Sequence, residues 1–452
     1  MTGAVERRMA LRPGVRLVTG RDSGISLLDG GRHSEAVGVL TQPQKAVLRA
    51  LAAGECAQAD LDVLAGPAAG PLVRRLHAGG WLTVHYAFGG RRLVTVRPLG
   101  PLGPPTAHRG PPAHAPAEAR LSRFAVLRGH GGALVLESPL SRAVFEVHSP
   151  EAMALLHALA GGPPPADLAA PVRTGLLALL ARYGFLDDAA AEDPPDLATE
   201  QWSPHELWFH RGSRAGHHDL PYGATGWAEG RFPPLPARRP PWPGAPVQLP
   251  VPEAGAPAMP LGAALRARRS LRTADERAPL TVAGLGEFLY LSAAADTGGP
   301  GGALRASPSG GGLHALELYP VVRTVDGLPG GMYHYDPYGH LLEPVPARPA
   351  TVRRLLADAT AATGGAAPQV LLVVSARFGR VMWKYRSMAY ALVLKDLGAL
   401  LQTMYLVATA TGLAPCALGT GDADLFALAT GLDPLAESSV GEFALSSRPD
   451  PG

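Results

Sequence analysis

A lysine and a tyrosine stand side by side at Lys384 and Tyr385, within the sequence Trp-Lys-Tyr-Arg. An amine next to a phenol can remove, relay or orient a proton, so this pair is a candidate for acid–base catalysis. The pair follows an apolar run that predicts a buried strand over 369–375. It precedes the longest apolar helical pattern of the chain, so we expect Lys384 and Tyr385 to open a helix that continues to about Thr411.

An upstream segment carries the donors that a phosphate group requires. Within five residues it contains three arginines and a serine, namely Arg268, Arg269, Ser270 and Arg272. Guanidinium groups bind phosphate oxygens in pairs, and a hydroxyl adds a short hydrogen bond. Standing alone, this segment would be the solvated basic end of an amphipathic helix over 261–269.

A glycine-rich segment lies between the two. It comprises Pro308, Ser309, Gly310 and Gly311, shortly before a predicted strand over 317–322. Consecutive glycines let backbone N–H groups approach a planar ring or an anion closely. A lone glycine triplet is usually only a turn, but its combination with the arginine and serine cluster favours a ligand site.

The composition is that of a globular protein without an evident nucleic-acid partner. The 452 residues suffice for two to four domains, 46% of them are hydrophobic, and the net charge is only +3. Cys56 and Cys416 form no C-x-x-C pair, so we expect neither a disulfide nor a thiolate zinc site. No signal-peptide pattern opens the chain, and charges interrupt the apolar stretch 389–418. These features predict a buried core helix and a cytoplasmic protein.

Connectors rich in proline or acidic residues, at 98–116, 187–200 and 232–260, divide the chain. The divisions predict an α+β protein whose C-terminal domain carries the chemistry. Its expected parts are a winged-helix-like module over 1–98, a second winged-helix-like module over 118–188, an arm rich in tryptophan and histidine over 200–230, a proline-rich linker over 231–260 and a catalytic domain over 261–452.

Both N-terminal modules contain helical runs that end at a glycine before a strand. In the first module the strand 81–88 turns at two glycines and returns over 91–96. Helices followed by a hairpin are typical of a winged helix. Such modules bind DNA through a helix or a peptide along a sheet edge, or they pack on a neighbouring domain. Scattered basic residues disfavour the DNA interpretation.

The arm contains four histidines within fourteen residues: His205, His210, His217 and His218. Their spacing does not match a H-E-x-x-H zinc helix, and nothing fixes a third ligand. We therefore predict no metal site. The arm is expected to lie across the catalytic domain and to help line its pocket.

The order of these motifs resembles the nitroreductase-like flavin fold, and more specifically the SagB-type dehydrogenases of azole-peptide biosynthesis. The resemblance covers about the last 190 residues, and the paired N-terminal modules resemble longer members of that family. It rests on the segments 268–272, 308–311, 333–337 (Tyr-His-Tyr-Asp-Pro) and 384–386, with Gln402 and Gly412-Leu413.

The resemblance implies FMN bound at a homodimer interface. The arginine and serine cluster would face its phosphate and ribityl chain, and Ser309 to Gly311 would lie near the flavin ring. The residues that the resemblance assigns to the cofactor are Arg268, Arg269, Ser270, Arg272, Pro308, Ser309, Gly310, Gly311, Gln402 and Gly419.

The resemblance also implies a reaction and its partners. Such enzymes oxidise thiazoline or oxazoline rings of a ribosomally made precursor peptide to thiazoles or oxazoles, alongside a cyclodehydratase complex. The family requires a Lys-Tyr pair, which matches Lys384 and Tyr385. A positioned base fits the ring proton that must leave, and FMN takes up a hydride, with oxygen as the expected electron acceptor.

Two other functions stay open from the sequence. One is a flavin reductase of nitro or quinone compounds that uses NAD(P)H. The other is a catalytically inactive scaffold that binds a peptide within a modifying complex. Flavin colour separates enzyme from scaffold, and peptide oxidation without NAD(P)H separates oxidase from reductase.

Overall fold

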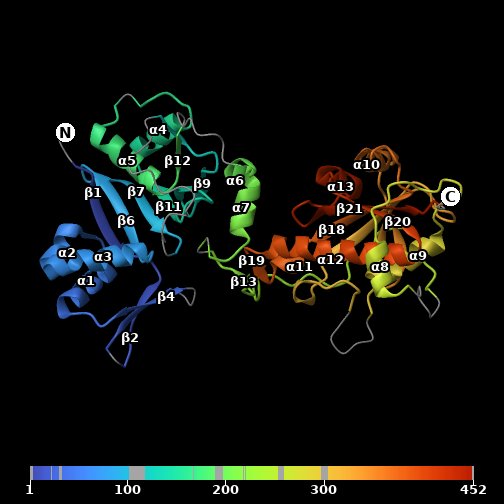
Figure 1. Cartoon of the computed structure of the whole chain (residues 1–452), viewed down its shortest axis with the longest axis horizontal. Coiled ribbons are helices and arrows are strands. Elements are labelled where there is room, and N and C mark those ends of the chain that lie inside the picture. Colours follow the sequence, from blue (N-terminus) through green and yellow to red (C-terminus); the bar gives the residue numbers. More distant parts are fainter. Residues whose placement is uncertain are drawn as a thin grey trace. The chain divides into compact units, whose positions relative to one another are not determined.

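The computed structural model describes residues 4–21, 23–29, 33–100, 118–165, 167–188, 197–216, 218, 220–252, 259–296 and 304–449. The chain forms two compact units, Met1–Leu220 and Pro221–Gly452 (Figure 1). Most of the connectors predicted at 98–116 and 187–200 lies outside the described residues. The division between the units falls inside the predicted arm, so the arm contributes residues to both.

One antiparallel sheet joins the two N-terminal modules in the first unit. Its order is β5-β1-β6-β7-β11-β10-β9, and Val96 of β7 lies opposite Phe145 of β11. Two smaller sheets have the orders β2-β3-β4 and β12-β8. The strands are β1 Glu6–Leu11, β2 Val15–Thr19, β3 Ile25–Asp29, β4 His33–Gly38, β5 Cys56–Ala57, β6 Leu82–Phe88, β7 Arg91–Pro98, β8 Ala119–Leu121, β9 Val126–His130, β10 Ala133–Glu137, β11 Ala143–Val147 and β12 Leu186–Asp188.

Helices cover this sheet and form two separate hydrophobic cores, one around Trp81 and one around Phe145. The hairpin β6–β7 follows three helices, as the sequence predicts. The two modules share one sheet, so the architecture alone does not establish separate winged helices. The winged-helix assignment stays a prediction. The helices are α1 Gln42–Ala53, α2 Gln58–Ala65, α3 Ala69–Ala78, α4 Pro150–Leu159, α5 Ala170–Arg182, α6 Leu197–Glu200 and α7 Pro204–Gly212, with a 3-10 turn η1 Gly66–Ala68.

The second unit is built on a seven-stranded antiparallel sheet of order β14-β17-β16-β15-β18-β21-β20. A separate two-stranded pair joins β13 to β19. The strands are β13 Gly223–Ala224, β14 Val247–Gln248, β15 Leu316–Val322, β16 Gly331–Asp336, β17 Leu341–Val345, β18 Val370–Arg377, β19 Tyr385–Arg386, β20 Leu413–Leu418 and β21 Glu437–Ser447. The helices are α8 Leu261–Ala267, α9 Val282–Ala293, α10 Pro349–Ala362, α11 Phe378–Met382, α12 Ala389–Ala410 and α13 Ala423–Thr430, with a 3-10 turn η2 Gly310–Gly312.

The strand β18 shows why helices cover both faces of this sheet. Its residues are buried throughout, and successive side chains point to opposite faces. Leu372 and Val374 belong to the core that includes α9 and α12, whereas Leu371 and Val373 belong to the core that includes α10 and α13. Figure 1 shows α10 and α13 on one side of the sheet and α12 on the other.

The long helix α12 does not begin where the sequence predicts. Lys384 and Tyr385 lie between α11 and α12, and Tyr385 belongs to β19. Ser387 has a φ of 61° and turns the chain before α12 starts at Ala389. The prediction that the pair opens the helix is therefore wrong. The reason is that β19 pairs with β13, a strand that no pattern in the sequence revealed.

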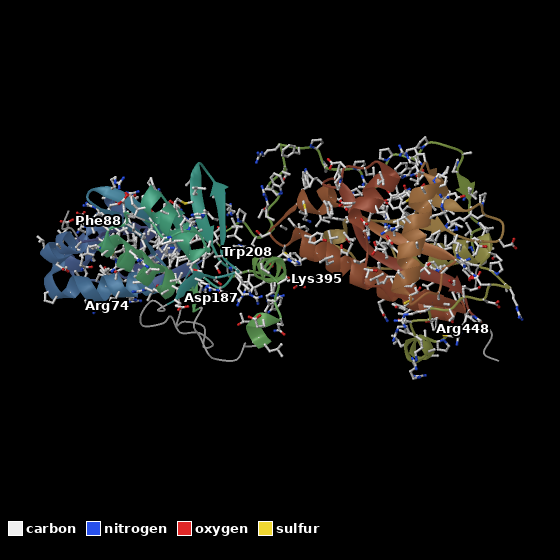
Figure 2. The ribbon with its side chains drawn as sticks, turned by 90° about the horizontal axis from the view of Figure 1, so that it is seen from above. Arg74, Phe88, Asp187, Trp208, Lys395 and Arg448 are labelled. Atoms are coloured by element: carbon white, nitrogen blue, oxygen red, sulfur yellow. The ribbon has the colours of Figure 1, made fainter. Side chains whose placement is uncertain are left out.

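Among the described helices, α12 is the one long and apolar enough to cross a membrane, by length and composition only. A third of its most apolar window is buried. Val393, Leu400 and Met404 pack into the core of the second unit. Lys395, labelled in Figure 2, is exposed, as is usual for the outer face of a core helix.

Candidate functional site

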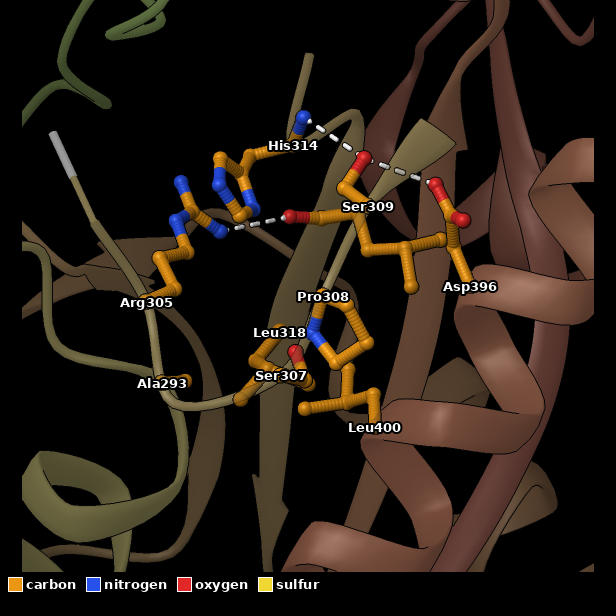
Figure 3. A pocket seen from close by; sticks show the side chains of 10 residues that line it. Ala293, Arg305, Ser307, Pro308, Ser309, His314, Leu318, Asp396 and Leu400 are labelled. Carbon is orange, nitrogen blue, oxygen red and sulfur yellow. Dashed lines mark hydrogen bonds between the residues drawn. The ribbon is translucent and has the colours of Figure 1, made fainter. Parts of the chain in front are cut away.

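A carboxylate of α12 holds the predicted glycine segment. Asp396 accepts a hydrogen bond from Ser309 Oγ at 2.7 Å and one from the Gly310 backbone N–H at 3.0 Å. Ser309 Oγ in turn accepts a bond from the His314 backbone N–H at 2.9 Å (Figure 3). Asp396 is only 8% exposed. Bonds to a buried carboxylate are strong, so this network fixes the shape of the segment.

The predicted acid–base pair meets this segment at Gly311. A Cβ atom at Gly311 would lie 2.7 Å from Tyr385 Oη and 3.4 Å from Lys384 Nζ. Gly311 has a φ of 67°, in the left-handed region that favours glycine. Both the backbone conformation and the close approach therefore require glycine. The structure thus brings together Lys384, Tyr385 and the glycine segment, which are far apart in the sequence.

A small pocket of about 20 Å³ opens beside the segment. Arg305, Pro308 and His314 are among its lining residues (Figure 3). Arg305 donates to the Leu316 carbonyl at 3.1 Å, but its buried Nε finds no hydrogen-bond partner in the described part of the chain. Burial lowers the pKa of His314, and the charge of Arg305 lowers it further, while the carboxylate of Asp396 opposes the shift.

The arginine and serine cluster lies at the other end of α12. Ser270 Oγ and Tyr405 Oη are 2.8 Å apart, and Tyr405 Oη also accepts the Ala417 backbone N–H at 2.8 Å. The guanidinium of Arg268 lies 5.3 Å from the centre of the Tyr405 ring. Arg269 and Arg272 are exposed. Within the described ranges no carboxylate pairs with Arg268, Arg269 or Arg272, although Arg269 Nη1 donates to the carbonyls of Arg266 and Arg268.

One copy of the chain does not bring all the predicted cofactor residues together. Asp396 contacts the glycine segment, and Tyr405 contacts the arginine cluster. These two residues are nine positions apart on α12. That spacing corresponds to about 13 Å along the helix and about half a turn around it. Gln402 and Gly419 are exposed near the second cluster, on α12 and directly after β20. The predicted cofactor residues therefore fall into two separate groups.

The Tyr-His-Tyr-Asp-Pro motif is structural in this fold. His334 donates toward Glu343 at 2.9 Å and toward Glu317 at 3.1 Å, and all three are buried. Burial alone would lower the pKa of His334, but the hydrogen bonds to the two carboxylates raise it. Glu317 lies between Leu316 and Leu318, which line the pocket, and so it faces the opposite side of the sheet.

The histidines of the arm do not converge. The ring of His210 stacks on Trp202 at 5.4 Å. His217 lies outside the described residues, and across the rest no group of three His, Cys, Asp or Glu side chains could hold a metal ion.

Sequence reasoning left two contributors to the site unassigned. Asp396 is one of the charges that interrupt the apolar stretch 389–418, and an acid on the buried face of a helix is itself a sign of a specific role. Arg305 had no such signal, because its role depends on β15, to which it is bonded.

Replacing Asp396 by alanine is expected to lower the free energy of unfolding by about 3 kcal/mol, because two hydrogen bonds to a buried carboxylate are lost. Urea denaturation measures this change, and the flavin content of the purified variant should fall with it. Lys395→Ala, at the exposed neighbouring position, should change neither quantity. Equal stability of the two variants would contradict the role given to Asp396.

The burial of Glu442 leads us to expect that the stability of the protein depends on pH. It is 9% exposed, its carboxyl oxygens lie 2.3 Å from where a Gly421 Cβ would be, and burial raises its pKa to about 7. Because folding raises the pKa of this carboxyl group, the free energy of unfolding of the protein falls as the pH rises from the unfolded pKa of the group to above 7. Glu442→Gln should therefore stabilise the protein at pH 8, by at most about 3 kcal/mol, but not at pH 4. Urea titrations at both pH values measure the difference, and equal effects at both would contradict it.

Comparison with known proteins gives two family matches. Residues 265–445 match the model of the nitroreductase family, and residues 119–219 match that of the cyanobactin oxidase ThcOx. A nitroreductase of Methanocaldococcus jannaschii is 29% identical over 34% of this chain and 74% of its own length. The microcin B17-processing protein McbC of Escherichia coli is 31% identical over 25% of this chain and 43% of its own length.

Among solved structures, the E. coli microcin synthetase McbBCD complex with truncated pro-MccB17 bound is similar at 19% identity and a TM-score of 0.36. The match covers 57% of this chain and all of the matched chain. The nitroreductase match lies in the second unit and includes the glycine segment, whereas the ThcOx match lies in the first unit. Residues 265–445 are therefore similar to the nitroreductase family and residues 119–219 to the cyanobactin oxidase ThcOx, which together indicate an oxidoreductase.

Proposed function

We propose that this protein is an FMN-dependent dehydrogenase that oxidises thiazoline or oxazoline rings of a ribosomally made precursor peptide to thiazoles or oxazoles. The observation that carries the proposal is the approach of Lys384 Nζ and Tyr385 Oη to Gly311. A base and a phenol beside a ligand-binding backbone are what proton removal from a bound ring requires.

The residues of the chain fit FMN. Arg268, Ser270 and Arg272 supply cationic and hydroxyl donors suited to a phosphate, and the glycine segment offers the backbone N–H of Gly311, since that of Gly310 donates to Asp396. The buried, unpartnered Nε of Arg305 is a further donor beside the segment. When bound there, FMN would supply the hydride acceptor for azoline oxidation, with oxygen as the expected electron acceptor.

The protein groups then account for the proton. Aromatising an azoline removes a hydride from one ring carbon and a proton from another. In this proposal Lys384 takes the proton, and Tyr385 orients the amine or relays the proton. Gly311 keeps space open for both side chains, which a Cβ atom would fill.

A homodimer would complete the site. The pocket of about 20 Å³ is too small to enclose a flavin ring, and the arginine cluster lies on the far side of α12. The helix also exposes apolar surface, including Tyr390 at 39%. We propose that a second copy covers this face and supplies the other half of the cofactor site. With the apolar face of α12 covered by a second copy, we propose that the enzyme is soluble and cytoplasmic.

The first unit is proposed to recognise the peptide or a partner protein. The named relatives include a microcin-processing protein and a synthetase complex with a pro-peptide bound, which supports a peptide substrate and a cyclodehydratase partner. A groove of about 940 Å³ is lined by three arginines, one histidine and one aspartate, namely Arg7, Arg74, Arg182, His77 and Asp62. Burial and the two arginines Arg182 and Arg7 lower the pKa of His77 to about 4. The positive charge of the groove therefore comes from its arginines, and this charge suits an acidic peptide segment.

Mass spectrometry of an azoline-bearing peptide tests the proposal. The purified protein should be yellow and should remove two mass units per ring without NAD(P)H. A requirement for NAD(P)H together with reduction of nitro or quinone compounds would favour the reductase alternative. A colourless protein that still binds the peptide would favour the inactive scaffold.

A further inference from the structure

The segment 382–387, which carries Lys384 and Tyr385, has little regular structure of its own. Met382 is the last residue of α11, and residues 383–387 lie between α11 and α12 with only the two-residue strand β19. Ser387 within it adopts a left-handed φ of 61°. A non-glycine residue keeps such a conformation only where its surroundings impose it.

A segment remote in the sequence imposes the conformation of 382–387 through backbone hydrogen bonds. Residues 221–232, which we call the strap, run beside 382–387. Gly223 pairs with Arg386 and Ala224 with Tyr385 in the antiparallel β13–β19 ladder. The Gly226 backbone N–H donates to the Lys384 carbonyl at 3.0 Å.

Side chains fix both ends of the same contact. Trp227 Nε1 donates to the Met382 carbonyl at 2.5 Å, and Ser387 Oγ donates to the Pro221 carbonyl at 2.8 Å. Trp383 Nε1 donates to the Phe232 carbonyl at 2.8 Å. Each of the residues 382–387 is therefore bonded to the strap or paired with it.

Trp227 of the strap contacts residues on both sides of the acid–base pair. The guanidinium of Arg386 lies 3.7 Å from the centre of its ring, and that of Arg231 lies 5.7 Å away. These cation–π contacts hold Arg386, the residue directly after the acid–base pair, while the indole N–H holds Met382 before it. One side chain thus fixes both flanks of Lys384 and Tyr385.

The chain beyond the strap is anchored to the sheet. Arg238 pairs with Asp336, Arg239 pairs with Glu437, and Arg377 donates to the Ala237 carbonyl at 3.1 Å. Asp336 and Glu437 are buried. The strap therefore connects the loop of the acid–base pair to the rigid core of the second unit.

We propose that Trp227 is a positioning residue that sets the placement of Lys384 and Tyr385 at Gly311; this inference rests on the proposed function. Trp227→Phe keeps an aromatic ring beside Arg386 but removes the donor to Met382. We expect kcat for azoline oxidation to fall about tenfold, and about 10²-fold for Trp227→Ala, because small displacements of catalytic groups have large effects on rate. KM, flavin content and Tm of Trp227→Phe should stay close to those of the wild type.

Hydrogen–deuterium exchange gives a readout that does not depend on activity. The peptide covering 382–388 should exchange faster in Trp227→Phe than in the wild type. Trp242→Phe is the matched control in the same unit, since the Trp242 Nε1 has no hydrogen-bond partner within the described residues. It should change neither the exchange of 382–388 nor kcat.

The outcomes separate the two proposals. Unchanged kcat and exchange in Trp227→Phe, beside an active wild type, would overturn the inference alone. Falls in Tm and flavin content that match the loss of kcat would also overturn it, since they indicate a merely structural role. If the wild type does not oxidise azolines, the proposed function fails, and faster exchange in the variant still supports the role of the strap.

Discussion

Lys384→Ala and Tyr385→Phe are expected to abolish the loss of two mass units per azoline ring while FMN stays bound. The amine of Lys384 and the phenol of Tyr385 lie nearest to where a Gly311 Cβ would be, and neither belongs to the donors assigned to the phosphate. Removing a general base or its partner typically lowers the rate by about 10²- to 10⁴-fold. Mass spectrometry of the peptide and the flavin absorbance of each variant measure the two effects.

Lys45→Ala is the control for the lysine substitution. Lys45 lies on α1 of the first unit, so the same chemical change should leave oxidation intact. Normal turnover in both Lys384→Ala and Tyr385→Phe would show that the catalytic assignment is wrong. Loss of flavin from both variants would instead show that the pair binds the cofactor.

The strands of the second unit follow directly from their sequence. The apolar runs predicted at 317–322 and 369–375 correspond to β15 (Leu316–Val322) and β18 (Val370–Arg377). Both strands are buried on two faces, and such strands have continuous apolar sequences. The start of α12 could not be found in this way. Met388 precedes the helix without a side-chain cap, so nothing in the sequence marks the boundary.

The site was predictable as separate motifs but not as an arrangement. Lys384, Tyr385 and the glycine segment were each singled out by residue type, yet their meeting depends on how α12 packs on the sheet. The distance between the arginine cluster and the glycine segment also depends on that packing. The strap left almost no signal, because its hydrogen bonds involve mainly backbone carbonyls, which every residue possesses.

Gly311→Ala is expected to reduce azoline oxidation by about 10²-fold, through a displacement of Tyr385 and Lys384. The new methyl group would lie 2.7 Å from Tyr385 Oη, a distance that forces the phenol to move. The left-handed φ of 67° adds a backbone cost of about 1 kcal/mol for any residue with a Cβ atom. Measurement of kcat, flavin content and Tm separates these two effects.

Gly312→Ala isolates the contact from the backbone cost. Gly312 has the same φ of 67°, but no atom lies within 4 Å of its added Cβ. Both variants should therefore lose similar stability, and only Gly311→Ala should lose most of its activity with FMN retained. Equal activities would show that Tyr385 does not act from its position at Gly311. A loss of flavin confined to Gly312→Ala would instead extend the cofactor site to that residue, since its Cβ would enter space that the protein leaves open.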